Sequence, residues 1–292
     1  MKLGLHAHPG KKRALELVQR VIAKVGGRAE LVVSDEVAAV APGIPHAPIE
    51  AMDADLLVAI GGDGTFLHTL RKTDLPLLPI NAGTVGVLAE VEAHRPNEVE
   101  VAVERLLSGF YYLEDRMKLA AQVGGTPLPD ATNEFVIHSA AVAKMGLFEI
   151  AFDGHVAGHI RADGLIVASP TGSTAYSLSS RGPILDSRID AIVLVAIAPF
   201  RTDPRAVVLE PLRTVRLRPL ERSPGAVVVA DGDAEFPLTP DAPVTIYRSP
   251  RPAVLVRFGS PFFYRLRGKR ILPWAEETAE EGSALADLPP PT

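Results

Sequence analysis

Hydrophobic and polar positions alternate in two different ways along the first 108 residues of the chain. The apolar runs in "KLGLHA", "AELVV", "DLLVAI" and "LPLLPI" predict short strands. Residues 11–27 and 97–109 instead carry apolar side chains every three or four positions, which predicts amphipathic helices. Gly26 and Gly27 provide a stop for the first helix. This alternation of strands and helices predicts a Rossmann-like α/β domain with an open, mostly parallel sheet.

The pattern changes after Tyr111, where many short β-rich runs follow one another with turn residues between them. Examples are "KLAAQV", "EFVIHSA", "GLIVASP", "AIVLVAI", "AVVVADG" and "AVLVRF". We therefore expect a second, mostly-β domain that resembles a sandwich of two packed sheets. The predicted division is 1–108 for the α/β domain, 109–266 for the β-rich domain and 267–292 for a C-terminal segment. The acidic, proline-rich end of that segment is expected to be disordered.

The composition fits a soluble globular protein of 292 residues and narrows the possible functions. The net charge of −5 gives no basic excess, so we expect no nucleic-acid partner. Cysteine is absent, which excludes disulfides, thiolate metal sites and cysteine nucleophiles. No apolar segment approaches the roughly 20 residues of a membrane span, and the N-terminus lacks the apolar run of a signal peptide. We therefore expect a cytoplasmic protein that does not associate with membranes.

The segment "LLVAIGGDGTFLHTL" contains the first candidate site. An apolar strand ends in Gly61 and Gly62, and Asp63, Gly64 and Thr65 follow where a helix is expected to begin. Ligands of open α/β sheets bind at the carboxyl ends of strands, and glycine-rich turns with unpaired N–H groups suit phosphates. A carboxylate repels phosphate unless it holds a metal or takes a proton, so Asp63 indicates phosphoryl transfer to a hydroxyl. The alternative is a plain strand-to-helix turn in which Asp63 or Thr65 is the N-cap.

Two further stretches place polar side chains beside apolar runs. In "RADGLIVASPTGSTAYSLSS" a predicted strand leads into six hydroxyl-bearing side chains within nine residues, which suits a polar ligand. These are Thr171, Ser173, Thr174, Tyr176, Ser177 and Ser179. Asn133 and Glu134 stand at the entry to another apolar run and could bind a diol or the edge of a base. For the hydroxyl-rich stretch, the alternative is a surface loop that leads into a capped helix. For Asn133 and Glu134, the alternative is a simple turn before a strand.

These three stretches together resemble the NAD kinases of the ATP-NAD kinase family. The resemblance rests on "GGDGTFL", "NEFVIH" and "DGLIVASPTGSTAYSLSSRGPIL" in that order, and it covers roughly residues 1–270. It implies an α/β domain, a β-rich domain, an active site between them and a C-terminal segment that partly folds back onto the first domain. The implied reaction is Mg²⁺-dependent transfer of a phosphoryl group from ATP to the adenosine ribose 2′-hydroxyl of NAD, which gives NADP. The family is typically homo-oligomeric, so a dimer or tetramer is expected.

The resemblance also implies roles for individual residues. Asp63 would be the general base, the glycine-rich loop would hold the ATP phosphates, and Mg²⁺ would be held mainly by those phosphates. The implied ATP contacts are Gly61, Gly62, Gly64 and Thr65. The implied NAD contacts are Asp63, Gly64, His68, Asn133, Glu134, Lys144, Arg161, Asp163, Thr174, Ala175, Tyr176, Ser177, Leu178, Ser179 and Ala198.

The chain departs from the family pattern at four places, one of which is the stretch "RTDPRAVVL" after "APF". Many relatives have Asp-Gly-Gln where this chain has Asp231, Gly232 and Asp233, so a carboxylate replaces an amide there. Arg181 stands where small residues are usual, and His68 stands at a variable place that is often arginine. These departures bear on affinity rather than on the reaction, because none of them involves Asp63.

Two other functions remain open from the sequence. Diacylglycerol and sphingosine kinases carry similar GGDG loops, although the acidic net charge and the lack of a basic amphipathic helix argue against a lipid kinase. A non-catalytic dinucleotide sensor is the other alternative, although a pure binder gains nothing from a carboxylate beside phosphates. The sequence leaves open whether the donor is ATP, another nucleotide or polyphosphate, and whether NADH is accepted.

Overall fold

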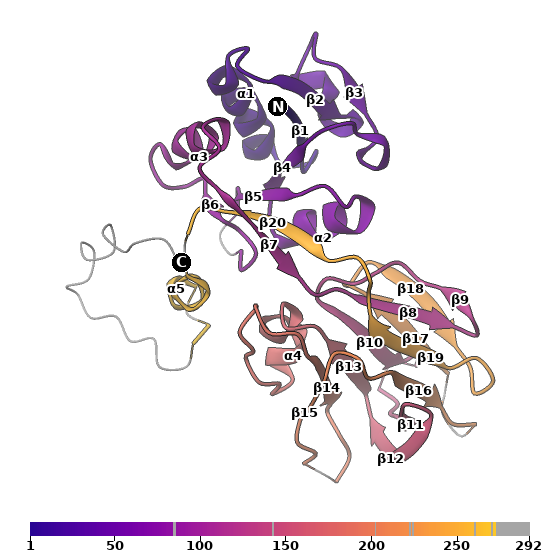
Figure 1. Cartoon of the computed structure of the whole chain (residues 1–292). Coiled ribbons are helices and arrows are strands. Elements are labelled where there is room, and N and C mark those ends of the chain that lie inside the picture. The colour runs from indigo at the N-terminus through magenta and orange to yellow at the C-terminus, as the bar shows by residue number, and fades with distance from the viewer. Residues whose placement is uncertain are drawn as a thin grey trace. The chain divides into compact units, whose positions relative to one another are not determined.

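The computed structural model describes residues 1–83, 86–141, 143–201, 203–221, 223, 225–259, 261–269 and 271–272. They form two compact units. Unit 1 consists of residues 1–114 and of the described residues from 254 onward, and unit 2 consists of residues 115–253. Along the path of the chain in Figure 1, the chain passes from unit 1 to unit 2 within β7 (Tyr112–Arg116) and returns to unit 1 at the start of β20 (Ala253–Arg257).

These boundaries, after residues 114 and 253, differ from the predicted ones, which were after residues 108 and 266. The run "AVLVRF" was expected in the β-rich domain, but it forms β20 in the sheet of unit 1. There it pairs in parallel with β5 (Leu77–Asn81), with Leu255 opposite Leu77. The difference arises because a short apolar run fits either sheet, and only its partner strand decides which core it joins.

Unit 1 is built on a sheet whose strands have the order β3-β2-β1-β4-β5-β20-β7, with β6 beside β5. Its other strands are β1 (Lys2–Ala7), β2 (Glu30–Ser34), β3 (His46–Ala47), β4 (Leu56–Gly61) and β6 (Val91–Glu92). The pairings from β3 through β2, β1 and β4 to β5 are all parallel. This order and direction match the doubly wound pattern, so the predicted Rossmann-like α/β fold is confirmed.

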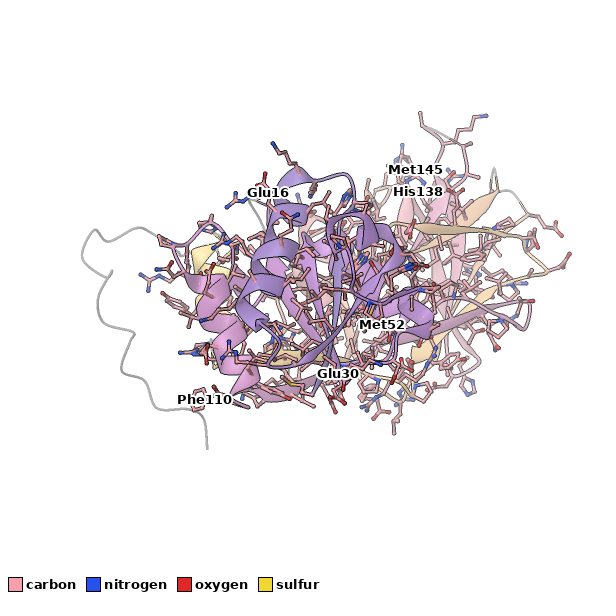
Figure 2. The ribbon with its side chains drawn as sticks, turned by 90° about the horizontal axis from the view of Figure 1, so that it is seen from above. Glu16, Glu30, Met52, Phe110, His138 and Met145 are labelled. Carbon is pink, nitrogen blue, oxygen red and sulfur yellow. The ribbon has the colours of Figure 1, made fainter. Side chains whose placement is uncertain are left out.

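The helices of unit 1 lie between its strands along the chain, except for α5, which follows the last strand. They are α1 (Lys12–Val25), α2 (Asp63–Lys72), α3 (Glu98–Leu107) and α5 (Phe262–Gly268), with 3-10 turns η1 (Asp35–Val40) and η2 (Ile49–Ala51). Helix α1 ends where the sequence predicts, because Gly26 takes a left-handed φ of 56° and its N–H bonds to the Ile22 carbonyl at 3.2 Å. Glu16 on the outer face of α1 and Phe110 after α3 are exposed and lie at the margin of the ribbon in Figure 2.

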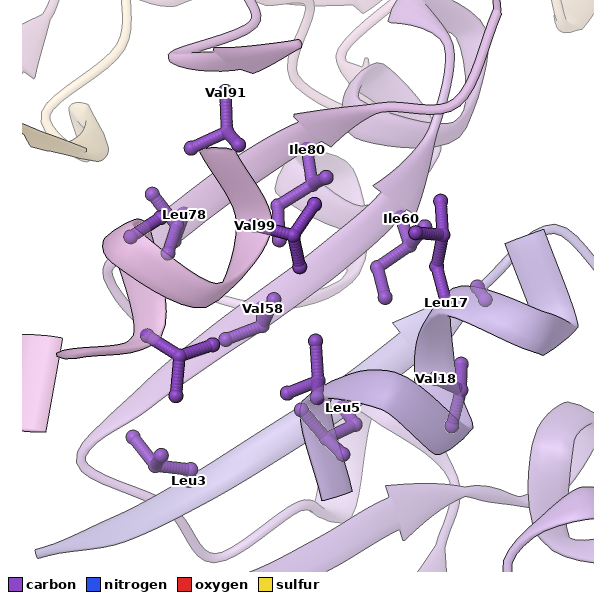
Figure 3. Close-up of a cluster of buried hydrophobic side chains, with 14 of the residues drawn as sticks. Leu3, Leu5, Leu17, Val18, Val58, Ile60, Leu78, Ile80, Val91 and Val99 are labelled. Carbon is purple, nitrogen blue, oxygen red and sulfur yellow. The ribbon is translucent and has the colours of Figure 1, made fainter. Parts of the chain in front are cut away.

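The core of unit 1 lies between the sheet and helices α1 and α3. Figure 3 shows side chains of both helices directed at the strands, among them Leu17, Val18 and Val99. The strands contribute Leu3, Leu5, Val58, Ile60, Leu78, Ile80 and Val91. Full burial of one such side chain stabilises a fold by about 1.5–3 kcal/mol, so this cluster holds the carboxyl ends of the strands in place.

Unit 2 contains two antiparallel sheets. One has the strand order β15-β14-β13-β10-β17-β18, and the other has the order β12-β11-β16-β19-β8-β9. The strands of the first are β10 (Glu134–Ser139), β13 (Gly164–Ala168), β14 (Ile192–Ile197), β15 (Val207–Leu209), β17 (Ala226–Ala230) and β18 (Ala234–Leu238). Those of the second are β8 (Leu119–Val123), β9 (Thr126–Pro127), β11 (Gly146–Phe152), β12 (His155–Ala162), β16 (Val215–Pro219) and β19 (Val244–Arg248).

A hydrophobic core lies between these two sheets. Phe135, Val167 and Val228 from the first sheet and Phe148 and Ile246 from the second belong to one buried cluster. The mostly-β, sandwich-like fold predicted for the second part of the chain is therefore confirmed. None of the helices formed by the described residues of either unit is long and apolar enough to cross a membrane.

The pattern of apolar positions did not reveal β12. Its sequence "HVAGHIRA" has few large apolar residues, and most of its side chains are exposed. The strand forms one end of its sheet and pairs with β11. An edge strand with little to bury carries a weak hydrophobic signal, which explains why the sequence did not predict it.

Candidate functional site

The glycine-rich loop joins β4 to α2 in unit 1. All 6 residues of β4 are buried, and the strand ends at Gly61. A Cβ on Gly61 would lie 2.3 Å from the Oγ1 of Thr65, so this close approach requires glycine. Gly62 is the N-cap of α2 and Asp63 is its first residue, with no side-chain capping bond. The alternative in which Asp63 or Thr65 caps the helix is therefore wrong.

The Asp63 carboxylate is instead held by backbone groups of the segment after β5. Its Oδ2 accepts a hydrogen bond from the N–H of Val87 at 2.9 Å, and its Oδ1 accepts one from the N–H of Leu88 at 3.3 Å. Burial raises the pKa of Asp63 above its ordinary value, while these two bonds and the charge of Lys269 oppose the rise. Asp63 is thus a buried carboxylate in a fixed orientation, with a pKa closer to neutrality than that of a free aspartate.

A buried polar cluster accompanies Asp63. Asn81, fully buried at the end of β5, donates from Nδ2 to the Oε2 of Glu92 at 2.8 Å. The Oδ1 of Asn81 accepts a hydrogen bond from the N–H of Gly83 at 2.9 Å. Lys269, directly after α5, forms an ion pair with Glu92. Both Lys269 and Glu92 act on the pKa of Asp63, the lysine lowering it and the glutamate raising it. Sequence reasoning missed this cluster, although Asn81 directly follows an apolar run at the carboxyl end of a strand.

Lys11 is a further candidate that the sequence did not single out. Its Nζ lies 3.9 Å from the position that a Cβ would take on Gly62, so the ammonium reaches the glycine-rich loop. Lys11 follows β1, which is the parallel neighbour of β4 in the sheet. The turn "HPGKKR" at the carboxyl end of that strand was the available signal. His68, a predicted contact, lies further along α2 with its Nδ1 3.4 Å from the Nη2 of Arg71.

In unit 2, Asp231 organises the entry to β10. Its Oδ2 accepts a hydrogen bond from the N–H of Thr132 at 2.8 Å. Its Oδ1 accepts bonds from the N–H groups of Asn133 at 2.8 Å and Glu134 at 3.1 Å. The first aspartate of the Asp-Gly-Asp sequence therefore has a structural role, and it fixes the predicted pair Asn133 and Glu134. Asp233 is exposed in the turn between β17 and β18.

Glu134 is a buried carboxyl group whose pKa rises to about 8. Burial is the largest cause, and the negative charge of Asp231 adds to it, while a hydrogen bond from the N–H of Tyr176 opposes the rise. Within the described part of the chain, the Oε2 of Glu134 and the Oγ of Ser177 are buried without a hydrogen-bond partner. Buried polar atoms of this kind gain a partner when a ligand or a water molecule binds beside them.

Part of the hydroxyl-rich stretch builds local structure rather than a ligand site. The Oγ of Ser173 donates to the carbonyl of Pro170 at 2.6 Å, and the Oγ1 of Thr174 donates to the carbonyl of Thr171 at 3.0 Å. These bonds shape η3 (Gly172–Thr174), which precedes α4 (Tyr176–Ser179). A Cβ on Gly172 would lie 2.1 Å from the carbonyl oxygen of Asn133, so this stretch packs directly against the entry to β10.

A groove of about 600 Å³ lies on unit 2 beside α4. Its lining includes Tyr176, Ser179, Arg181, Ala198, Asp203 and Arg205. Three of these are predicted NAD contacts, and Arg181 is one of the noted departures. Its guanidinium lies 4.0 Å from the Asp203 carboxylate, and both side chains are exposed. The fold therefore brings Tyr176, Ser179 and Ala198 together in a hollow that can hold a ligand.

Two other predicted residues of unit 2, Arg161 and Asp163, lie close to Ala198. The N–H of Asp163 bonds to the carbonyl of Ile197 at 3.0 Å, and the N–H of Phe200 bonds to the carbonyl of Arg161 at 2.8 Å. These bonds place Arg161 and Asp163 next to the segment that carries Ala198. Lys144 is exposed in the connection between β10 and β11 and does not line the groove.

Family models match two regions of the chain and show to which protein family it belongs. The ATP-NAD kinase N-terminal domain matches residues 46–111, and the ATP-NAD kinase C-terminal domain matches residues 132–258. The chain belongs to the ATP-NAD kinase family. The resemblance inferred from the three motifs is thereby confirmed, and the two matched regions contain Asp63 and the Glu134 site respectively.

Curated members of the ATP-NAD kinase family resemble the chain over most of its length. The NAD kinase of Thermococcus gammatolerans is 37% identical over 273 residues, which cover 91% of this chain and 97% of the relative. The NAD kinase of Methanothermobacter thermautotrophicus is 36% identical over 277 residues, covering 93% and 96%.

Solved structures of the family share the fold. The NAD kinase from Archaeoglobus fulgidus in complex with ATP has a TM-score of 0.76 and 27% identity, and the match covers 93% of this chain and 100% of that one. Yeast NADH kinase complexed with NADH has a TM-score of 0.79 and 22% identity, covers 88% of this chain and 83% of its own, and shows the fold alone.

Proposed function

We propose that the protein is an NAD kinase, which transfers the γ-phosphoryl group of ATP to the adenosine ribose 2′-hydroxyl of NAD and releases ADP and NADP. The observation that carries this proposal is the buried carboxylate of Asp63 in a glycine-rich turn at the carboxyl end of β4. Membership of the ATP-NAD kinase family supports it, because both halves of the chain match. Curated relatives named NAD kinase, at 35–37% identity, support it further.

Asp63 is the proposed general base. A carboxylate has about four lone-pair positions, and the N–H groups of Val87 and Leu88 occupy one on each oxygen. The remaining positions can accept the proton of the 2′-hydroxyl while that oxygen attacks phosphorus. Burial raises the pKa of Asp63 and so strengthens it as a base, and the two N–H donors keep its orientation.

The glycine-rich loop is the proposed binding site for the ATP phosphates. The contacts are those that the resemblance implies: Gly61, Gly62, Gly64 and Thr65. A Cβ on Gly64 would meet nothing within 4 Å, which leaves space at the start of α2 for a ligand. Lys11 beside Gly62 adds a positive charge to this site. Mg²⁺ is proposed to be bound mainly by the triphosphate, as the resemblance to the family implies.

The acceptor NAD is proposed to bind through the residues that the sequence singled out in unit 2. Asn133 and Glu134 offer an amide and a carboxyl group with an unpartnered oxygen. Tyr176, Ser179 and Ala198 line the groove beside α4. The remaining proposed contacts are Lys144, Arg161, Asp163, Thr174, Ala175, Ser177 and Leu178 in unit 2, and Asp63, Gly64 and His68 in unit 1.

A homo-oligomer, either a dimer or a tetramer, is also proposed. Val156 on β12 is 58% exposed, and Val208 on β15 is 50% exposed. Both strands stand at the ends of their sheets, and exposed apolar edge strands favour pairing with another copy. Light scattering on the purified chain would give its mass in solution. The cytoplasmic location expected from the sequence remains a prediction.

The test of the function is a coupled assay. Purified protein is mixed with NAD, ATP and Mg²⁺, and any NADP that forms is detected with an NADP-specific dehydrogenase. We expect NADP and ADP in equal amounts. NAD binding in a calorimeter without ATP consumption would contradict the kinase and favour the dinucleotide sensor. NADP formed with polyphosphate but not with ATP would correct the donor.

A further inference from the structure

The last strand of unit 1 ends in a buried arginine beside the segment that holds Asp63. Arg257 is 0% exposed at the end of β20. Its Nη1 donates to the carbonyl of Leu88 at 3.0 Å and to the Oε2 of Glu90 at 3.1 Å, and its Nε donates to the Oε2 of Glu114 at 2.6 Å. The N–H of Phe258 also donates to Glu90, at 2.8 Å. Several hydrogen bonds from one planar, charged guanidinium fix the geometry of the backbone and carboxylates that accept them.

Leu88 connects this arginine to Asp63. Its carbonyl accepts the bond from Arg257, and its N–H donates to the Oδ1 of Asp63. The adjacent N–H of Val87 donates to the Oδ2 of the same carboxylate. The guanidinium therefore holds the peptide group that follows Leu88, and the carboxylate holds the two peptide groups that precede it, so this stretch of backbone is fixed from both ends.

We propose that Arg257 is a positioning residue for Asp63 and acts through the backbone of Leu88. By holding the carbonyl of Leu88, it keeps the N–H groups of Val87 and Leu88, which lie just before that carbonyl in the chain, aimed at the Asp63 oxygens. Arg257 itself does not contact the reactants in this proposal. The inference rests on the proposed function in one respect, because it takes Asp63 to be the base of the reaction.

A purely structural role for Arg257 is the competing explanation. The guanidinium compensates Glu90, whose side chain is 1% exposed, and Arg265 lies 3.6 Å from the same carboxylate. Removing one partner of a buried ion pair destabilises the fold because it leaves an uncompensated charge. A stability measurement alone cannot separate the two roles, so the test needs a signal from Asp63.

The other charged groups that face Asp63 stay in place in this test. Lys269 from the segment after α5 and Glu92 from β6 both act on its pKa. Lys11 from the turn before α1 approaches the neighbouring Gly62, and His68 lies further along α2. Since none of them is altered, a change in the titration of Asp63 reports on the peptide groups of Val87 and Leu88.

The experiment compares two variants with one control. Arg257→Lys keeps the charge, but a single ammonium lacks the fork that reaches Leu88, Glu90 and Glu114 together. The double variant Arg257→Met/Glu90→Gln removes both charges of the buried pair, so it leaves no charge of that pair uncompensated. It replaces Arg257→Lys in the test if that variant does not fold. Leu17→Ala truncates a buried side chain of α1 in the same unit and lowers stability without touching this network.

Asp63 is followed by carbon-13 carboxyl NMR on the ligand-free chain, with its signal assigned by Asp63→Asn. We expect the pKa of Asp63 to rise in both Arg257 variants, because weaker N–H donors stabilise the anion less, and to stay unchanged in Leu17→Ala. In the assay we expect kcat to fall about 10-fold to 100-fold with little change in the KM for NAD, since positioning acts on the reacting state. The acidic limb of the kcat–pH profile should move to higher pH.

An Asp63 titration equal to that of the wild type in the folded variants would overturn the positioning role. The titration needs no substrate, so it stands apart from the proposed function. If the wild type makes no NADP, the kinase proposal fails, and the titration still decides whether Arg257 positions Asp63. If the wild type makes NADP and the titration does not move, the function stands and this inference fails.

Discussion

Asp63 in unit 1 and Glu134 in unit 2 are both carboxyl groups whose pKa is raised by burial. Their neighbours differ. Asp63 accepts hydrogen bonds from two backbone N–H groups and lies near the positive charge of Lys269, and all three oppose the rise. Glu134 has one such N–H bond, from Tyr176, and lies near the negative charge of Asp231, so its pKa reaches about 8.

The comparison shows that burial alone does not decide what a carboxyl group can do. Burial favours the neutral acid in both units, and the neighbouring charges and donors then separate the two groups. At pH 7 a group with a pKa of about 8 is mostly protonated, so Glu134 can donate a hydrogen bond. Asp63, with donors aimed at both oxygens, is suited to accept a proton instead.

The largest effect should come from removing the charge of Asp63. Asp63→Asn is expected to lower turnover by about 10²-fold or more, because an amide cannot accept the proton of the hydroxyl. NAD affinity, measured by calorimetry, should be largely kept. Glu134→Gln replaces a neutral acid by a neutral amide of the same shape and should leave turnover far less affected. The exposed Asp53→Asn is the matched control, and equal losses in the Asp63 and Glu134 variants would refute the contrast.

A second change disturbs only the Glu134 site. In Gly172→Ala the new Cβ would lie 2.1 Å from the carbonyl oxygen of Asn133, so the two stretches must separate. We expect a loss of stability of about 1–3 kcal/mol, measured by urea unfolding, together with weaker NAD binding. Gly158→Ala on β12 is the control, since nothing lies within 4 Å of its added Cβ. Unchanged NAD affinity in a folded Gly172→Ala protein would exclude this packing from the binding site.

The third prediction concerns the pH dependence of stability. The pKa of Glu134 rises from 4.5 to about 8 on folding, so the folded state holds the proton more tightly. The stabilisation by neutral Glu134 is complete below about pH 4.5 and is lost as the pH rises through about 8. The free energy of unfolding of the wild type should therefore fall steadily relative to that of Glu134→Gln as the pH rises from 4.5 to about 8. A difference that is constant with pH would show that Glu134 titrates normally.

The smallest expected effect is that of Lys269. Its positive charge lowers the pKa of Asp63, so Lys269→Met should raise that pKa and move the acidic limb of the kcat–pH profile upward. Lys12→Met is the control, because that side chain is 92% exposed on α1. A profile that is identical in all three proteins would mean that Glu92 screens Lys269 from Asp63.

Much of the fold was predictable because its elements are set by local patterns. The buried run of β4 and the glycines after it identified both the strand and the loop of Asp63. The helix that ends at Gly26 followed from apolar spacing and a glycine stop. The order of the three motifs indicated the family. The edge strand β12 and the sheet to which β20 belongs were not predictable, since neither depends on its own apolar pattern alone.

The sequence by itself singled out the residues proposed to carry the chemistry, because an aspartate among glycines after a buried strand favours phosphoryl transfer to a hydroxyl. Only the tertiary structure decided what those residues meet. Asp63 is bonded to residues 24 and 25 positions away, Asp231 holds Thr132 across 99 positions, and Arg257 holds Leu88 across 169. Hydrogen bonds of such separation form only when the chain folds. Burial raises the pKa of both Asp63 and Glu134, and the donors and charges that the fold places beside each group then make the two differ.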